Sequence, residues 1–316
     1  MIPSVAHTRL ASQEKDAGLN IEESILRTLT YFDLFHYPLL LTEIRDFLDR
    51  ELSVIQLSKC LDGLIAAKRV FRYQEFYMLH ANPLLVHRRK EENELAVSMM
   101  EKALRIGRFL QQFPYVRAIA ISGSLSKNVA GPTADIDFFI ITSSNRLWIA
   151  RTCMHLYKKF TFLRGRQHYY CMNYYVDESA LLLDEHNIFT AIELKTLLPV
   201  SGYTVMQQFF NKNHWSHQWL PAYAFRKQCS PDRPYPILKK VAEWVFNNKL
   251  GDGLDNLLFT ITSKRWKRKE AGGKRNAKGE TMGLITNKHF ARSNPGGFQE
   301  KLLSLYEEKL KKHLFP

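Results

Sequence analysis

The sequence is organised around one stretch, which reads Ala118-Ile-Ala-Ile-Ser-Gly-Ser-Leu-Ser-Lys-Asn-Val-Ala-Gly-Pro-Thr-Ala-Asp-Ile-Asp-Phe-Phe-Ile-Ile-Thr142. The apolar residues before Ser122-Gly123-Ser124 predict a strand, and the small residues themselves predict a turn. A second apolar run begins at Ile136 and predicts another strand. The stretch therefore predicts a strand, a small-residue turn, a loop and a second strand.

Two carboxylates stand at the start of the second predicted strand. Asp135 and Asp137 are two positions apart, so their side chains share one face of the strand, roughly 6.6 Å apart. At an effective dielectric constant of roughly 20 they repel each other by about 2.5 kcal/mol, and Asp is depleted in strands. A divalent cation with oxygen ligands would offset this cost. The alternative, a hairpin with a solvated Asp pair, explains neither the glycine turn nor the apolar run after Asp137.

This combination resembles the signature of the DNA polymerase beta-type nucleotidyltransferase superfamily. The resemblance is carried by Gly123-Ser124 between two strands and by Asp135-Ile-Asp137-Phe-Phe139 at the start of the second. It implies a small mixed sheet with helices, in which the Gly-Ser turn holds a nucleoside triphosphate and both acids hold Mg²⁺. Backbone N–H groups at a glycine turn can approach phosphate oxygens, while Ser124 and Lys127 add a hydroxyl donor and a positive charge.

The resemblance also implies a third carboxylate on the strand predicted over residues 169–176, acting as a general base or a further metal ligand. The residue at the inward position is Asn173, whose amide can orient a group but cannot take a proton as a carboxylate does. Asp177 and Glu178 follow this strand and could substitute if it is short. Glu193 is a more distant candidate, for which a solvated helix charge is the simpler interpretation.

Two arginines follow the acidic strand, on a helix predicted over residues 146–157. Arg146 and Arg151 are candidates to contact triphosphate oxygens, because guanidinium groups form charge-assisted hydrogen bonds with phosphate. A solvated basic face is an equally good interpretation of both. The expected catalytic set is therefore Asp135, Asp137 and Asn173, and the expected nucleotide-binding set adds these two arginines to the turn.

The pattern of apolar residues divides the chain into four regions. Residues 1–20 predict a flexible tail, and residues 21–86 predict three helices and a hairpin, an order typical of a winged helix-turn-helix. Residues 87–200 hold the predicted nucleotidyltransferase domain. Residues 201–316 predict a helical C-terminal domain with a basic loop over 264–279. The expected fold class is therefore α+β.

The predicted winged helix allows two interpretations. Its third helix, with Lys59, Lys68 and Arg69, could face a DNA groove. Few basic residues lie on the outer face of that helix, and Asp62 interrupts them, which favours a packing or partner-binding module.

A second resemblance covers residues 160–220, and the winged-helix front end matches it too. It is similar to a group of bacterial nucleotidyltransferase-like proteins through Cys171-Met-Asn-Tyr-Tyr175, Phe189-Thr-Ala-Ile-Glu-Leu194 and Asn213-His-Trp-Ser-His-Gln-Trp-Leu-Pro221. This likeness implies that Asn173 is a feature of the group.

The composition sets broad limits on the chain of 316 residues. Hydrophobic residues make up 45% and charged residues 24%, as in soluble globular proteins. The net charge of +14 favours a polyanionic partner such as nucleic acid, a phosphate-rich substrate or an anionic surface. The widely spread Cys60, Cys153, Cys171 and Cys229 indicate reduced thiols in a cytoplasmic protein. No run of about 18 apolar residues exists, so neither a transmembrane helix nor a membrane partner is expected.

Two functions follow from these expectations. The first is a magnesium-dependent nucleotidyltransferase, which moves a nucleoside monophosphate from an NTP to an unknown hydroxyl acceptor and releases pyrophosphate. The second is a catalytically weak or inactive nucleotide-binding regulator, which binds DNA or a partner protein through its winged helix. The amide at Asn173 and the basic surface favour the second function.

Overall fold

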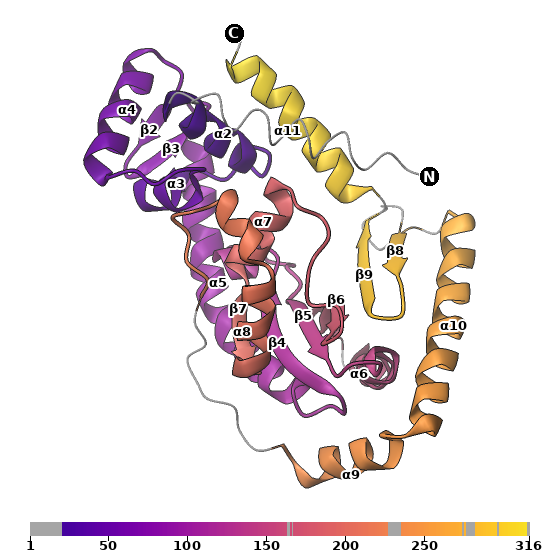
Figure 1. Ribbon diagram of the computed structural model, residues 1–316. Coiled ribbons are helices and arrows are strands. Elements are labelled where there is room, and N and C mark those ends of the chain that lie inside the picture. The colour runs from indigo at the N-terminus through magenta and orange to yellow at the C-terminus, as the bar shows by residue number, and fades with distance from the viewer. Residues whose placement is uncertain are drawn as a thin grey trace.

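The computed structural model describes residues 21–162, 165, 167–226, 235–273, 275, 282–295 and 297–314. Within these residues, a three-stranded sheet lies near the N-terminus and a six-stranded sheet lies in the centre, with helices around both (Figure 1). The predicted tail at residues 1–20 lies outside the described residues, as does most of the predicted basic loop beyond residue 273.

The N-terminal module consists of three helices and three short strands, namely α2 (Ile21–Asp33), β1 (Leu39–Leu40), α3 (Leu41–Phe47), α4 (Val54–Ala66), β2 (Phe71–Tyr73) and β3 (Phe76–Met78). Helix α4 begins with a capping box, in which Ser53 Oγ accepts a hydrogen bond from the backbone N–H of Gln56 at 3.2 Å. Strands β2 and β3 form the antiparallel hairpin expected around Gln74. The order of elements is the predicted one, and the assignment to a winged helix-turn-helix stays a prediction.

The central sheet has the strand order β7-β4-β5-β6-β9-β8. Its strands are β4 (Val116–Ser122), β5 (Asp137–Thr142), β6 (Cys171–Asp177), β7 (Leu198–Ser201), β8 (Met282–Thr286) and β9 (Phe290–Pro295). Strands β5 and β6 are parallel and the other neighbours are antiparallel, so the sheet is mixed, as expected. The predicted strand pair around the Gly-Ser turn is β4 and β5, with Ser122 opposite Asp137.

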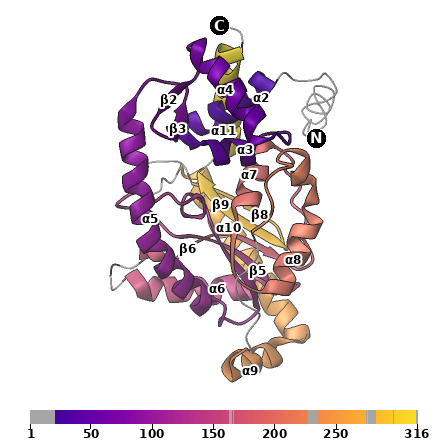
Figure 2. The same ribbon diagram turned by 90° about the vertical axis from the view of Figure 1, so that its left-hand side faces the viewer.

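Helices cover both faces of this sheet (Figures 1 and 2). The helices after the N-terminal module are α5 (Pro83–Leu110), α6 (Leu147–Phe162), α7 (Ile188–Thr196), α8 (Tyr203–Lys212), α9 (Ile237–Phe246), α10 (Lys249–Ala271) and α11 (Phe298–Leu314), of which α5 to α8 pack on the faces of the sheet. On β5, Phe138 and Ile140 pack in one core cluster with residues of α5 and α6, whereas Phe139 and Ile141 pack in another with residues of α7 and α8. This alternation follows from the two-residue period of a strand, and it makes β5 the buried centre of three layers.

The C-terminal region differs from the helical domain expected over residues 201–316. Strands β8 and β9 lie in it and extend the central sheet, with β9 antiparallel to β6. Without them β6 would be an edge strand with unpaired backbone groups. Helix α11 packs back on α2, where Lys309 Nζ lies 2.6 Å from Asp33 Oδ2. The region is therefore corrected to helices plus a strand pair shared with the rest of the molecule.

Two expectations drawn from the composition concern the cysteines and the absence of a membrane-spanning helix. Cys60, Cys153 and Cys171 are free thiols in the structure, and Cys229 lies outside the described residues. Of the helices in the described part of the chain, none is both long and apolar enough to cross a bilayer.

The step from β7 to α8 depends on Gly202. Its φ is +81°, a conformation that residues with a side chain rarely adopt. An added Cβ would overlap the carbonyl oxygen of Arg117 and lie 2.5 Å from the Cα of Ala118. Because β4 is the strand that leads to the Gly-Ser turn, this close approach holds β7 and α8 against the strand that positions the site.

We expect Gly202→Ala to lower the free energy of unfolding by roughly 2 to 4 kcal/mol, from backbone strain and overlap with β4. Gly253→Ala in α10 is the matched control, because a Cβ there meets nothing within 4 Å. That variant should be neutral or more stable by up to about 1 kcal/mol, since Ala is the better helix former. Denaturant unfolding measures both, and equal stability of the two variants would contradict the account.

Candidate active site

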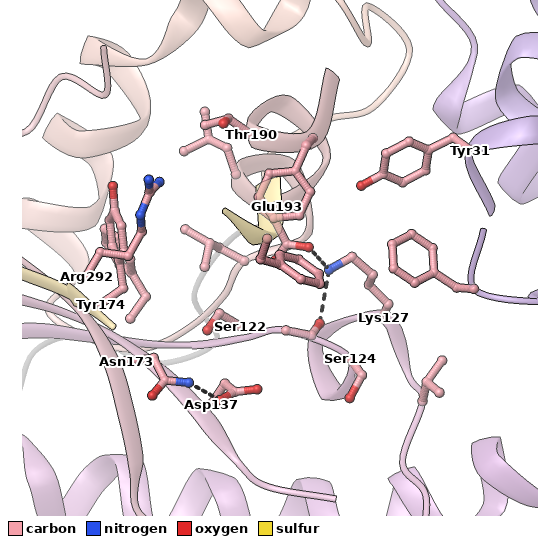
Figure 3. A pocket seen from close by; sticks show the side chains of 18 of the residues that line it. Tyr31, Ser122, Ser124, Lys127, Asp137, Asn173, Tyr174, Thr190, Glu193 and Arg292 are labelled. Atoms are coloured by element: carbon pink, nitrogen blue, oxygen red, sulfur yellow. Dashed lines mark hydrogen bonds and ion pairs between the residues drawn. The ribbon is translucent and has the colours of Figure 1, made fainter. Parts of the chain in front are cut away.

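A cavity of about 640 Å³ lies between the N-terminal module, the Gly-Ser turn, α7 and β9 (Figure 3). The predicted site residues Gly123, Ser124, Lys127, Asp137 and Asn173 all line it. They come from the end of β4, the turn after it, and the starts of β5 and β6. The structure thus brings together most of the residues that the sequence singled out.

Gly123 forms the turn at the end of β4 and lies directly against Asp137. Its φ is +67°, and an added Cβ would lie 2.6 Å from Asp137 Oδ2. The pairing of Ser122 with Asp137 across β4 and β5 fixes this approach. Only glycine satisfies both the backbone conformation and the lack of space, so the turn and the carboxylate are positioned as one unit.

Asn173 faces the carboxylate of Asp137, as its inward position on the strand predicted. Its Nδ2 donates a hydrogen bond to Asp137 Oδ1 at 2.6 Å, while its Oδ1 accepts one from Cys171 Sγ at 3.1 Å. The amide is therefore held at both ends. It occupies one oxygen of Asp137 and leaves Oδ2 toward the glycine turn.

Asp135 precedes β5 and is not among the residues that line the cavity. His168 Nδ1 lies 3.1 Å from Asp135 Oδ1. Burial raises the pKa of the Cys171 thiol to about 12, and the negative charges of Asp137 and Asp135 add to this rise. Both carboxylates thus act on one thiol and lie at the same end of β5 and β6.

Asp135 and Asp137 are candidate oxygen ligands for a divalent cation. Among the described residues, no group of three or more His, Cys, Asp and Glu side chains is arranged to hold a metal ion. Mg²⁺ is commonly bound by one or two carboxylates, with waters and substrate phosphates supplying the other ligands. Asp135 and Asp137 would supply the two carboxylates, and a substrate phosphate would have to supply a further ligand.

Lys127 is paired on the cavity wall. Its Nζ donates to Glu193 Oε1 at 2.7 Å and to the carbonyl oxygen of Gly123 at 3.0 Å (Figure 3). Glu193 comes from α7 and also lines the cavity. A continuous series of contacts therefore runs from Asn173 through Asp137 and Gly123 to Lys127 and Glu193.

The structure places Arg146 and Arg151 away from this cavity. Arg146 Nη1 lies 2.6 Å from Asp252 Oδ1 on α10. Arg151 is buried, with its guanidinium carbon 5.6 Å from the centre of the Trp148 ring and 6.0 Å from that of Trp266. Helix α6 packs on α10 and carries both arginines there. The expectation that they contact triphosphate oxygens at the turn is therefore corrected.

Asp177, the last residue of β6, and Glu178 after it do not replace Asn173. The register pairs Asp137 with Cys171 but Thr142 with Asp177, so Asp177 lies roughly 13 Å along the strand from Asn173. Asp177 is fully buried and accepts hydrogen bonds from the backbone N–H groups of Asn145 and Ser179, both at 2.9 Å. Its carboxylate has a structural role, and Glu178 lies farther still.

Several cavity residues were not predicted from the sequence. Arg292 on β9 forms a bidentate ion pair with Glu185, with distances of 2.5 and 2.8 Å, and both residues line the cavity. Tyr31 reaches it from α2 and Phe35 from the turn that follows this helix. No local signal marks these positions, because they meet the site only through long-range packing of α2 and β9.

We expect Cys171 to react with iodoacetamide far more slowly at pH 9 than a thiol of ordinary pKa, which is half ionised near pH 8.5. Asp137→Asn removes one of the charges that raise this pKa, so alkylation at the same pH should be several-fold faster. The measurement uses a variant in which Cys60, Cys153 and Cys229 are replaced by Ser. Asp62→Asn on the exposed side of α4 is the control, and an ordinary thiol pH profile in the parent would contradict the expectation.

The comparisons with known proteins agree with this geometry. The family model of the nucleotidyltransferase domain matches residues 101–213, a range that contains the turn, both aspartates, Asn173 and Glu193. No curated protein and no solved structure matches the chain. Residues 101–213 therefore match the nucleotidyltransferase domain, which supports the expected likeness to polymerase beta-type nucleotidyltransferases for this part of the chain.

Proposed function

We propose that this chain transfers a nucleoside monophosphate from a magnesium-bound NTP to a hydroxyl acceptor and releases pyrophosphate. The domain match supports nucleotidyl transfer in general. The observation that carries the proposal to individual residues is the contact between the Gly123 backbone and the Asp137 carboxylate, at the wall of a cavity of about 640 Å³.

In the proposal, the turn after β4 binds the phosphates. Its backbone N–H groups and the Ser124 hydroxyl donate hydrogen bonds to phosphate oxygens. Asp135 and Asp137 would hold Mg²⁺, which when bound stabilises the charge on the phosphates and on the leaving pyrophosphate. Lys127 keeps the turn in shape through its hydrogen bond to the Gly123 carbonyl.

Asn173 is proposed to be a positioning residue. Its amide fixes Asp137 Oδ1, which directs Oδ2 to the phosphate side of the turn. An amide cannot accept the proton of the attacking hydroxyl. Another group therefore has to take that proton. Among the acids on the cavity wall, Glu193 is connected to Asp137 through Lys127 and Gly123.

We assign the general base to Glu193. Its carboxylate lines the cavity and lies 2.7 Å from the ammonium of Lys127. An ionised carboxylate on the wall of the cavity can take a proton from an acceptor hydroxyl. In this proposal, Asp135 and Asp137 would hold the metal ion, and Glu193 would accept the proton.

The N-terminal module is proposed to shape the substrate pocket. Tyr31 and Phe32 of α2, and Phe35 just after that helix, supply aromatic surface to the cavity wall. Arg69, one of the basic residues considered for DNA contact, donates to the carbonyl oxygen of His313 at 2.7 Å. These contacts indicate that the N-terminal module forms a wall of the pocket rather than a DNA-binding surface. The alternative of an inactive DNA-binding regulator is therefore not favoured.

We expect Asp137→Asn and Asp135→Asn each to lower nucleotidyl transfer at least about 100-fold, because metal stabilisation of the transition state is worth several kcal/mol. The assay combines each alpha-labelled NTP with Mg²⁺ and cell extract, and follows labelled product and pyrophosphate. Asp62→Asn is the control. Transfer that persists in both variants, or in excess EDTA, would reject the assignment of the two aspartates.

We expect Glu193→Gln to lower kcat by about 100-fold or more while leaving KM for the nucleotide nearly unchanged, as for loss of a general base. Glu101→Gln on the exposed side of α5 is the control. A raised KM with an unchanged kcat would show that Glu193 only supports the turn through Lys127.

A further inference from the structure

Helix α9 packs against the rest of the protein through its charged side. It lies at the end of the molecule opposite the N-terminal module, in both views (Figures 1 and 2). Lys239 and Glu243 are four residues apart and therefore lie on one face of the helix. Lys239 is almost fully buried, and its Nζ donates to the carbonyl oxygens of Gln111 and Val116 at 2.8 and 2.6 Å.

Glu243 completes this anchor. It accepts two hydrogen bonds from the guanidinium of Arg117, both at 2.9 Å, and one from the backbone N–H of Tyr115 at 2.7 Å. These are partly buried, charge-assisted contacts of good geometry, which fix the rotation of the helix about its axis. The orientation of α9 is thus specified by its own polar residues.

The opposite face of α9 is apolar and faces outward. Ile237, Leu238 and Trp244 are 80%, 81% and 80% exposed. Val241 and Val245 continue the same face, and Leu250, near the start of α10, is also exposed; Leu257 and Ile261 are exposed farther along α10. An amphipathic helix of a soluble domain normally buries such a face, and an exposed apolar patch of this kind marks an interaction surface.

The charges around this face are mostly positive. Of the four acidic residues in α9 and α10, Glu243 binds Arg117, Asp252 binds Arg146, and Asp255 accepts from the backbone N–H groups at the start of α6. Asp252 is paired but half exposed, and Glu270 lies at the far end of α10. The exposed basic residues next to this face are Lys240 and Lys249, and Lys264, Arg265, Lys267 and Arg268 are exposed in the last turns of α10.

We propose that the outer face of α9 and the adjoining turns of α10 form a peripheral docking surface for an anionic lipid bilayer. A helix that carries aliphatic residues and Trp beside Lys and Arg is suited to the boundary between acyl chains and acidic headgroups. Its place at one end of the molecule lets it enter a flat bilayer. None of the described residues that line the cavity belongs to α9 or α10, so docking leaves the cavity open.

Two other occupants fit the surface less well. A second copy of the chain would bring two molecules of net charge +14 together, and like charges oppose such a contact. Nucleic acid would satisfy the basic residues but would offer no partner for Ile237 and Leu238, since its binding surfaces recognise phosphates and bases. The bilayer satisfies both kinds of side chain, and the contact needs no spanning helix.

The test is sedimentation of the full chain with vesicles of phosphatidylcholine alone or with added phosphatidylglycerol. We expect binding to the anionic vesicles only, weakened by salt, and weakened at least about tenfold in the double variant Leu238→Ser, Trp244→Ser. Ile55→Ser is the matched control, because Ile55 is 82% exposed on α4 and its loss should leave binding unchanged. Substitutions at such exposed positions should preserve the fold, which circular dichroism checks.

Three outcomes would overturn the proposal. One is the absence of binding to vesicles of either composition. Another is binding that the double variant leaves intact. The third is a dimer in analytical ultracentrifugation that the double variant converts to a monomer, which would assign the surface to a second copy. None of these outcomes depends on nucleotidyl transfer, so the docking proposal stands or fails separately from the proposed activity.

Discussion

The structure depends on the close contact between the backbone of Gly123 and the carboxylate of Asp137. The contact exists because β4 ends at Ser122, directly opposite the first residue of β5, and because position 123 has no side chain. Strand β5 is held in place by cores on both of its faces, so the carboxylate cannot move away from the turn. A flexible loop would not maintain the turn and the carboxylate at this separation.

The elements that carry this contact could be predicted from the sequence, since each depends on local rules. Small residues between two apolar runs predict a turn, and the two-residue period of a strand places Asn173 on the inward face of β6. The structure agrees, because the amide of Asn173 donates to Asp137. The same period excludes the later acid at Asp177 once the register of β5 and β6 is known.

The rest of the site could not be predicted, because it depends on which distant segments meet. A helical pattern puts Arg146 and Arg151 on α6 but does not reveal that α10 packs beside that helix. Strand β9 gives a weak pattern of its own, yet it supplies Arg292 to the cavity. The ion pair between Lys127 and Glu193 joins residues 66 positions apart, so neither side chain predicts the other.

The cavity and the rest of the surface differ in charge. This difference explains why the proposed activity includes a cation. Among the described residues that line the cavity, three are cationic (Arg88, Lys127 and Arg292) and four are anionic (Glu92, Asp137, Glu185 and Glu193). The net charge of +14 is therefore not concentrated where a triphosphate would bind. A triphosphate would meet a slightly negative wall, with Asp135 close by, and this repulsion in a partly buried site is strong. A divalent cation between the carboxylates and the phosphates would turn this repulsion into attraction, which is why the proposed activity includes magnesium. The basic residues of α9 and α10 lie outside the cavity and remain available for another anionic partner.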